Sequence, residues 1–127
     1  MCLQKRLKYR HPTKNCVLCH GEVDQIIKFE IIFKVLVFAI NQPSVRVSKK
    51  ICFRERGNNV VFGLKGIIYT GNFHYTARVC THGVVWVHDV MVIGRNCKYE
   101  GKLSAFSRSD LSKCNKKTLS LVVYAQN

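Results

Sequence analysis

The sequence predicts a mostly β fold, of the β-rich α+β class, organised around an antiparallel sheet, and three observations support it. β-branched and aromatic residues gather in short runs between turn signals, as in Leu64–Tyr69. Apolar and polar residues alternate from Phe73 to Val79, which indicates a strand with one apolar and one polar face. The long apolar segment Gln25–Ile40 lacks the 3.6-residue spacing of an amphipathic helix. With 127 residues, the chain forms at most one domain, which is large enough to bury a core.

The chain divides into a basic N-terminal segment, residues 1–15, and a β-rich remainder, residues 16–127. We expect the first segment to be poorly ordered or a clipped strand, because it is polar and terminal. In the remainder, β-prone runs predict strands at 26–32, 35–40, 45–53, 60–62, 64–69, 73–79 and 84–90. After these we expect turns at 94–96 and at Tyr99–Gly101, then a short helix at Ser109–Ser112 capped by Ser109 or Asp110, and a final strand at Leu119–Ala125.

The net charge is +14, and many of the basic residues gather in three groups, within residues 5–10, 49–56 and 113–117. Such a charge favours attraction to nucleic acid or to an acidic protein surface. The alternative is a set of solvated faces that only keep the protein soluble, because no run of five like charges occurs. A small basic β-protein that binds nucleic acid or an acidic partner therefore stays open as a function.

An RNA-binding function would require exposed aromatic side chains on a basic face of the sheet. The alternation of the sequence instead places Tyr69, Phe73, Tyr75 and Trp86 among the core residues. This expectation weighs against RNA binding.

Seven cysteines are present, and no apolar segment of the kind found in secretory signals lies near the N-terminus. We therefore expect reduced thiols and a cytoplasmic or nuclear location. No apolar run reaches the length of a transmembrane helix, so no membrane association is expected.

Cys16 and Cys19 form a C-x-x-C pair, which is half of the ligand set of a zinc ribbon. A structural zinc site needs four ligands, and no second pair of this kind exists. Cys2, His11 and His20 are the other candidate ligands nearby. We expect two unligated thiols and no cofactor, and partial zinc binding through Cys16, Cys19 and a histidine is the alternative.

Two residues in the segment 64–90 are candidates for a hydrogen-bonded pair of imidazole and carboxylate. His74 lies near the start of one predicted strand and Asp89 near the end of the next, with a turn at Thr81–Gly83 between them. A four-residue loop, Cys80–Gly83, would place His74 opposite Asp89 on one face, close enough for a hydrogen bond. A three-residue loop would turn Asp89 to the other face, so the register decides whether the two residues meet.

The order of residues in this segment resembles the histidine box of the ubiquitin-specific proteases, which are papain-like cysteine peptidases that remove ubiquitin. The matching positions are Leu64, Gly66-Ile67-Ile68, Gly71, His74-Tyr75-Thr76-Ala77, Gly83, Trp86 and Asp89. The resemblance implies that His74 is a catalytic histidine, that Asp89 orients its imidazole, and that the sheet corresponds to the palm and fingers of that domain. Phe73 stands where the family has a glycine, and Val90 where it has a second acidic residue. A looser similarity extends over residues 16–125, with Cys16 and Cys19 in the place of a zinc pair of the fingers.

The cysteine box of that family, whose nucleophile lies at a helix N-terminus, has no counterpart in this sequence. Cys52, Cys80, Cys97 and Cys114 precede no predicted helix, so we expect none of them to be the nucleophile. The resemblance therefore implies a C-terminal part of a thiol-dependent deubiquitinase, which supplies the His/Asp half of a Cys-His-Asp triad and is inactive alone. Its expected partners are ubiquitin or a ubiquitin-like protein and an upstream half of the same catalytic domain. Whether the chain acts as an enzyme stays open.

Overall fold

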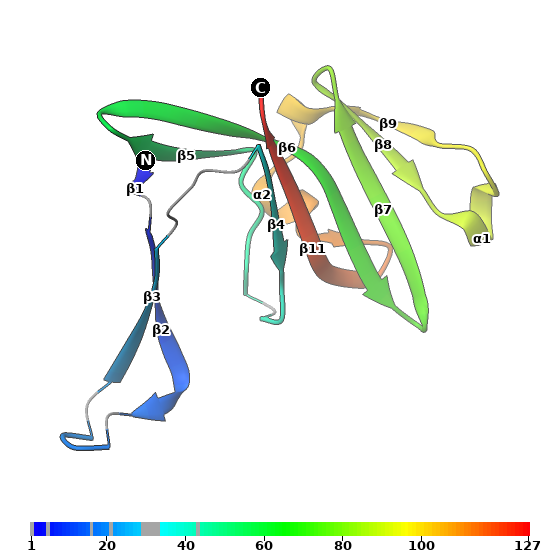
Figure 1. Cartoon of the computed structure of the whole chain (residues 1–127). Coiled ribbons are helices and arrows are strands. Elements are labelled where there is room, and N and C mark those ends of the chain that lie inside the picture. Colours follow the sequence, from blue (N-terminus) through cyan, green and yellow to red (C-terminus); the bar gives the residue numbers. More distant parts are fainter. Residues whose placement is uncertain (1, 5, 16, 21, 29–33, 43) are drawn as a thin grey trace.

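Strand β6 (Asn58–Gly71) is the longest strand and holds the main sheet together. The computed structural model describes residues 2–4, 6–15, 17–20, 22–28, 34–42 and 44–127. One edge of β6 pairs with β11 (Lys117–Gln126), and its other edge pairs with β5 (Lys50–Glu55) and then with β7 (His74–Thr81). These pairs are all antiparallel, as Figure 1 shows for the long β6–β11 and β6–β7 ladders. The predicted mostly β fold with an antiparallel sheet is therefore confirmed.

The remaining strands extend this sheet on both sides. β8 (Val84–His88) pairs with β7, and β9 (Lys98–Lys102) pairs with β8 at one edge. On the other side, β4 (Val35–Ala39) and the short β10 (Lys113–Cys114) pair with β11. β1 (Cys2–Gln4) adds a parallel pair with β5. The described part of the basic segment 1–15 thus lies in β1 and in β2 (Arg6–Asn15), which forms a separate hairpin with β3 (Glu22–Lys28).

The described helical turns are α1 (Val90–Ile93), the 3₁₀ turn η1 (Leu103–Ala105) and α2 (Arg108–Leu111). Leu111 of α2 and Leu103 of η1 pack on one face of the sheet, whereas α1 has no buried residue. The turn expected at Tyr99–Gly101 is wrong, because these residues belong to β9. The predicted short helix exists, but Ser107 caps it in place of Ser109 or Asp110, and the side chains of Ser107 and Asp110 bond each other's backbone N–H groups.

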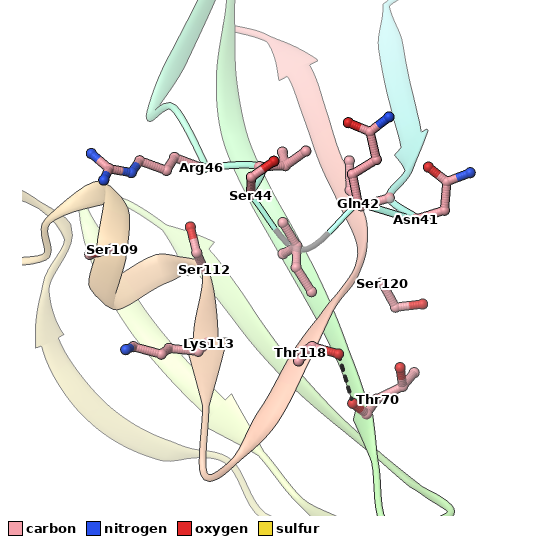
Figure 2. A pocket seen from close by; sticks show the side chains of 13 residues that line it. Asn41, Gln42, Ser44, Arg46, Thr70, Ser109, Ser112, Lys113, Thr118 and Ser120 are labelled. Carbon is pink, nitrogen blue, oxygen red and sulfur yellow. Dashed lines mark hydrogen bonds between the residues drawn. The ribbon is translucent and has the colours of Figure 1, made fainter. Parts of the chain in front are cut away.

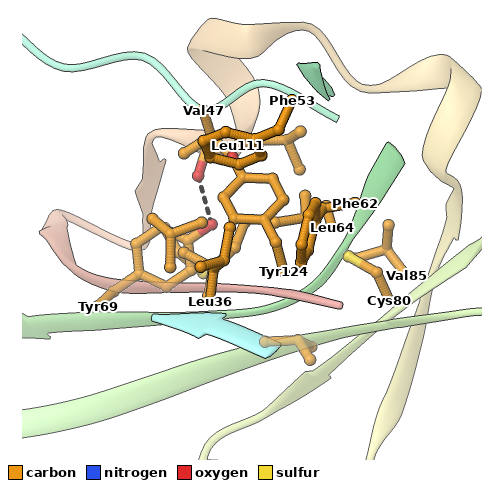
Figure 3. Close-up of a cluster of buried hydrophobic side chains, with 14 residues drawn as sticks. Leu36, Val47, Phe53, Phe62, Leu64, Tyr69, Cys80, Val85, Leu111 and Tyr124 are labelled. Atoms are coloured by element: carbon orange, nitrogen blue, oxygen red, sulfur yellow. Dashed lines mark hydrogen bonds between the residues drawn. The ribbon is translucent and has the colours of Figure 1, made fainter. Parts of the chain in front are cut away.

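The covered face of the sheet carries the hydrophobic core, shown in Figure 3. Its largest fully buried side chains are Tyr69, Phe53, Phe62, Ile67 and Leu111. Phe53 and Phe62 meet edge to face at 5.5 Å across β5 and β6, the offset geometry that aromatic rings prefer. Leu111 closes the core from α2, and Val47 closes it from the segment before β5. The strand expected at 45–53 therefore begins only at Lys50, and the chain before it packs over the core.

The structure buries the face of β7 that the sequence marks as polar. Thr76 and Arg78 are 1% and 8% exposed, whereas Tyr75 is 67% exposed and Phe73 is fully exposed. The expectation that Phe73 and Tyr75 belong to the core is therefore wrong, while Tyr69 is buried as expected. The reason is that α2 and β10 cover the polar face and satisfy its hydrogen-bonding groups.

Arg78 is the centre of this buried polar network. Its guanidinium donates to both carboxylate oxygens of Glu100, at 2.7 and 3.4 Å, and to the hydroxyl of Tyr69 at 3.1 Å. The same group donates to the carbonyl oxygens of Asp110 and Lys113, at 2.8 and 3.1 Å. Tyr69 in turn donates to the carbonyl of Leu111 at 2.5 Å, the contact drawn in Figure 3. Since every partner lies on a different segment, one cation fastens β6, β7, β9 and α2–β10 together.

Candidate active site

The hairpin of β7 and β8 brings His74 and Asp89 together, but in a register different from the expected one. Thr81 pairs with Val84, so the loop contains only His82 and Gly83, and the expectation of a four-residue loop is wrong. Both loop residues have positive φ angles, 49° and 74°, as a two-residue type I′ hairpin turn requires. The shift places Asp89 just beyond the end of the ladder, level with Thr76. Because two registers that differ by two residues keep the same faces, His74 still shares a face with Asp89.

Asp89 accepts hydrogen bonds from three described groups. The Nε2 atom of His74 lies 2.6 Å from its Oδ1, and the hydroxyl of Thr76 donates to its Oδ2 at 3.1 Å. The backbone N–H of Met91 donates to Oδ1 at 3.1 Å, which makes Asp89 the N-cap of α1. The predicted contact between His74 and Asp89 is therefore present, and Thr76 and Met91 fix the carboxylate that holds the imidazole.

The contact with Asp89 determines which nitrogen of His74 can react. An ionised carboxylate only accepts hydrogen bonds, so Nε2 must carry the proton. The neutral ring then has its lone pair on Nδ1, for which the described residues offer no hydrogen-bond partner. The His74 side chain is 23% exposed. A partly accessible, oriented imidazole with a vacant basic nitrogen is the arrangement that a general base requires.

Lys117 completes the surroundings of the carboxylate. Its ammonium lies 3.8 Å from Oδ2 of Asp89, and both side chains are largely buried. The stem of Lys117 passes over Gly71, where an added Cβ would come within 3.2 Å of Cγ and 3.3 Å of Cα of Lys117. A side chain at position 71 would therefore displace Lys117. Sequence reasoning missed both Thr76 and Lys117 as members of this site. The period-two alternation from His74 could have identified Thr76, while no local signal links Lys117 to Asp89.

The hydrogen bond from His74 is the largest cause that holds the pKa of Asp89 below its usual range. Burial opposes this effect, while Met91 and Thr76 support it. The backbone N–H of Ser107 likewise lowers the pKa of Asp110. A carboxyl group whose pKa is lowered by folding stabilises the native state above its unfolded pKa, and this contribution is lost as the pH falls through the folded pKa.

We therefore expect the urea midpoint of the chain to fall steeply as the pH drops below about 4, the usual range of carboxyl groups. Asp89→Asn and Asp110→Asn should each flatten this acid-side dependence, because an amide does not titrate. Urea titrations between pH 2 and pH 7 measure the effect. An acid-side slope that stays unchanged in Asp89→Asn would show that this carboxyl group is not ionised preferentially in the native state.

The turn before His74 contains a residue in an unfavourable conformation. Asn72 and Phe73 connect β6 to β7, and both have positive φ angles, 52° and 58°. Asparagine tolerates this region, but a bulky residue such as phenylalanine does so only with strain. Position 73 is also the one for which the resemblance to the histidine box of the ubiquitin-specific proteases implies a glycine. The backbone conformation here is thus the one that glycine adopts without cost.

We expect Phe73→Gly to stabilise the chain by about 1 kcal/mol, because glycine relieves the backbone strain and Phe73 is fully exposed. Phe73→Ala provides the control, since alanine removes the ring and keeps the steric penalty of a Cβ. Chemical denaturation of the three proteins measures the differences. Equal stability of the glycine and alanine variants would contradict the assignment of strain to this position.

Two of the described cysteines, Cys80 and Cys114, lack the features of an activated nucleophile. Burial raises the pKa of the Cys80 thiol to about 11 and also raises that of Cys114. A catalytic thiol needs the opposite shift, towards the thiolate. Cys19 and Cys97 are exposed, and Cys52 is disulfide-bonded, so the expectation of uniformly reduced thiols is wrong for Cys52.

The cavities of the chain lie at separate places on its surface. Figure 2 shows one of about 620 Å³, between β11, α2 and the segment before β5. It is lined by hydroxyl and amide groups and by Arg46 and Lys113, and the Thr118 hydroxyl donates to the Thr70 carbonyl at its edge. His74 lines a smaller cavity of about 320 Å³ together with Tyr75, His88 and Val90. We locate the candidate site at the smaller cavity, because the acid–base groups lie there.

The structure bears only weakly on whether the chain binds zinc or associates with a membrane. Cys16 lies outside the described residues, and Cys19 is exposed. Among the residues that the structure describes, no cluster of three or more His, Cys, Asp or Glu side chains could hold a metal ion. No helix within the same residues is long and apolar enough to cross a membrane.

Comparison with protein-family models, with curated proteins and with solved structures gives no match to this chain. The functional argument therefore depends on the residues themselves.

Proposed function

We propose that the chain supplies the His/Asp half of a Cys-His-Asp site, as the C-terminal part of a catalytic domain similar to the ubiquitin-specific proteases. The observation that carries the proposal is the 2.6 Å contact between Nε2 of His74 and Oδ1 of Asp89. In such a domain the sheet would be the palm of a papain-like peptidase, and its covered face would carry the acid–base pair.

The local surroundings fit the roles that this chemistry assigns. With Nε2 committed to Asp89, Nδ1 of His74 would take the proton of an incoming thiol, and the resulting thiolate would attack the carbonyl of the substrate. Asp89 would then stabilise the charged imidazole, and Thr76 and Met91 would hold the carboxylate in position. The nucleophile would come from an upstream half, because the buried thiols of Cys80 and Cys114 have raised pKa values.

The partner of the complete site would be ubiquitin or a ubiquitin-like protein. We expect the chain alone to leave a fluorogenic ubiquitin C-terminal amide uncleaved and to remain unlabelled by a ubiquitin probe that traps thiolates, because the nucleophile of the proposed site would come from the upstream half. Addition of the separately expressed upstream half of a ubiquitin-specific protease, which carries the cysteine box, should restore cleavage. A mutant upstream half with serine in place of its nucleophile provides the control.

Two results would contradict the proposal. Labelling of the chain alone would mean that one of its own cysteines is reactive, and Cys19 and Cys97 would be tested first because they are exposed. Failure of every upstream half tested to bind the chain or to gain activity from it would remove the support for a complementing domain.

A further inference from the structure

Another cavity of the chain is surrounded by lysines and lies away from the His74–Asp89 pair. It has a volume of about 430 Å³ and is lined by Lys49, Lys50, Lys65, Cys80, His82, Asn127 and neighbouring residues. We call it the lysine pocket. It lies between the β5–β6 ladder, the β7–β8 turn and η1, at the end of the sheet where Figure 1 shows both that turn and the C-terminus.

The backbone explains why three lysines meet here. Lys50 pairs with Gly63 in the β5–β6 ladder, and the carbonyl of Lys49 accepts a hydrogen bond from the backbone N–H of Leu64. Lys65 lies at the irregularity between β6 and β11, where the register of the ladder shifts. This bulge leaves its side chain exposed, next to the rim of the pocket.

The charge of the pocket is strongly one-sided. None of the residues that line it is Asp or Glu, whereas Lys49, Lys50 and Lys65 each bring a positive charge. Lys49 donates to the carbonyl of Ser104 at 3.4 Å, and Lys65 donates to the side chain of Asn127 at 3.3 Å. Each of these ammonium groups therefore uses one of its three donors on a neutral acceptor and keeps the others for a ligand.

We propose that the lysine pocket binds a phosphate-rich anion, with the ammonium groups of Lys49, Lys50 and Lys65 as its positive contacts. Lysine is a common phosphate-binding residue because its compact charge has several donors, and the volume lies in the range of small-molecule sites. Like charges around one cavity repel, and a bound polyanion removes this repulsion. The same chemistry could come from a free oligophosphate or nucleotide, or from the backbone of a nucleic acid.

Two triple variants of equal charge distinguish binding in the lysine pocket from general attraction of anions to the positively charged protein. Lys49→Gln/Lys50→Gln/Lys65→Gln removes three positive charges from the pocket. Lys34→Gln/Arg54→Gln/Lys98→Gln removes three exposed positive charges that do not line it. Both variants lower the net charge of +14 by the same amount. Thermal unfolding verifies that both remain folded, and Lys50→Gln and Lys65→Gln are single-variant substitutes if the triple variant fails to fold.

Titration calorimetry with pyrophosphate, with ATP and with a single-stranded oligodeoxythymidine measures binding. We expect the pocket variant to lose affinity for pyrophosphate by at least about tenfold, and the control variant by less than about threefold, because only the first removes direct phosphate contacts. If the site serves nucleic acid, the pocket variant should also lower the salt dependence of oligonucleotide binding, by roughly 0.7 in the log–log slope for each lysine.

The outcomes show whether the lysine pocket binds phosphate groups and whether these belong to a small molecule or to a nucleic acid. Selective loss with pyrophosphate and ATP alone supports a nucleotide or oligophosphate pocket, and selective loss with all three ligands supports a backbone contact of nucleic acid. Equal losses in the two triple variants, or no saturable binding by the unmodified chain, would overturn the proposal. None of these residues lies in the His74–Asp89 site, so the result is independent of the peptidase proposal.

Discussion

Replacement of His74 by alanine should abolish the activity of a reconstituted enzyme, with a fall in kcat of at least about a thousandfold. The physical reason is that, in the proposed site, the Nδ1 lone pair of His74 would accept the thiol proton. KM should change little, because in the proposed site the imidazole would act on the nucleophile and would not contact ubiquitin. The measurement is cleavage of a fluorogenic ubiquitin amide by the two halves together.

His82→Asn is the matched control for this variant. His82 is exposed in the β7–β8 turn with φ 49°, a conformation that asparagine tolerates well. We expect the control to keep near-full activity. An equal loss in both variants would point to damage to the hairpin rather than to loss of a base.

Asp89→Asn should reduce kcat by about two to four orders of magnitude with the fold retained. The amide can still cap α1 and accept from Thr76, but it carries no charge to stabilise an imidazolium. It can also donate to Nε2 and so favour the wrong tautomer of His74. If Asp89 only caps the helix, this conservative change would leave both kcat and its pH profile unaltered.

Arg78→Met should destabilise the fold by about 3 kcal/mol, the largest loss of stability that we expect from a single substitution outside the apolar core. Methionine fills much of the volume but leaves the Glu100 carboxylate without its bidentate partner. The carbonyl oxygens of Asp110 and Lys113 also lose a buried donor. Urea unfolding at neutral pH measures the change in the free energy of unfolding.

Two further variants test whether the loss of stability in Arg78→Met comes from the buried contacts of Arg78. Arg54→Met, at an exposed position of β5, should change stability by no more than about 0.5 kcal/mol. Arg78→Met combined with Glu100→Gln should recover part of the loss, because the unpaired carboxylate is removed at the same time. A small effect of Arg78→Met alone would mean that the contacts to β9 and α2–β10 contribute little to the native state.

The sequence by itself determined the β class, most of the strands and the pairing of His74 with Asp89. These depend on local rules: β-branched and aromatic runs, the alternation of side chains, and the turn residues between strands. The His–Asp contact survived an error in the loop length because only the parity of the register decides which residues share a face. The strand β9 was missed, since a glutamate and a glycine in a short segment look like a turn.

Only the tertiary structure decided which face of the sheet is buried. The alternation in β7 shows two different faces, but burial depends on what packs against them, and the cover comes from η1, α2 and β10, which follow in the chain. Arg78 could enter the interior because Glu100, Tyr69 and two carbonyl oxygens meet it there. Lys117 also meets its partner through the tertiary structure. Because β11 pairs with β6, the side chain of Lys117 passes over Gly71 and its ammonium group lies near Asp89. Contacts between residues far apart in sequence leave no local pattern, so a charged residue that is buried with its partners looks in the sequence like one that is exposed.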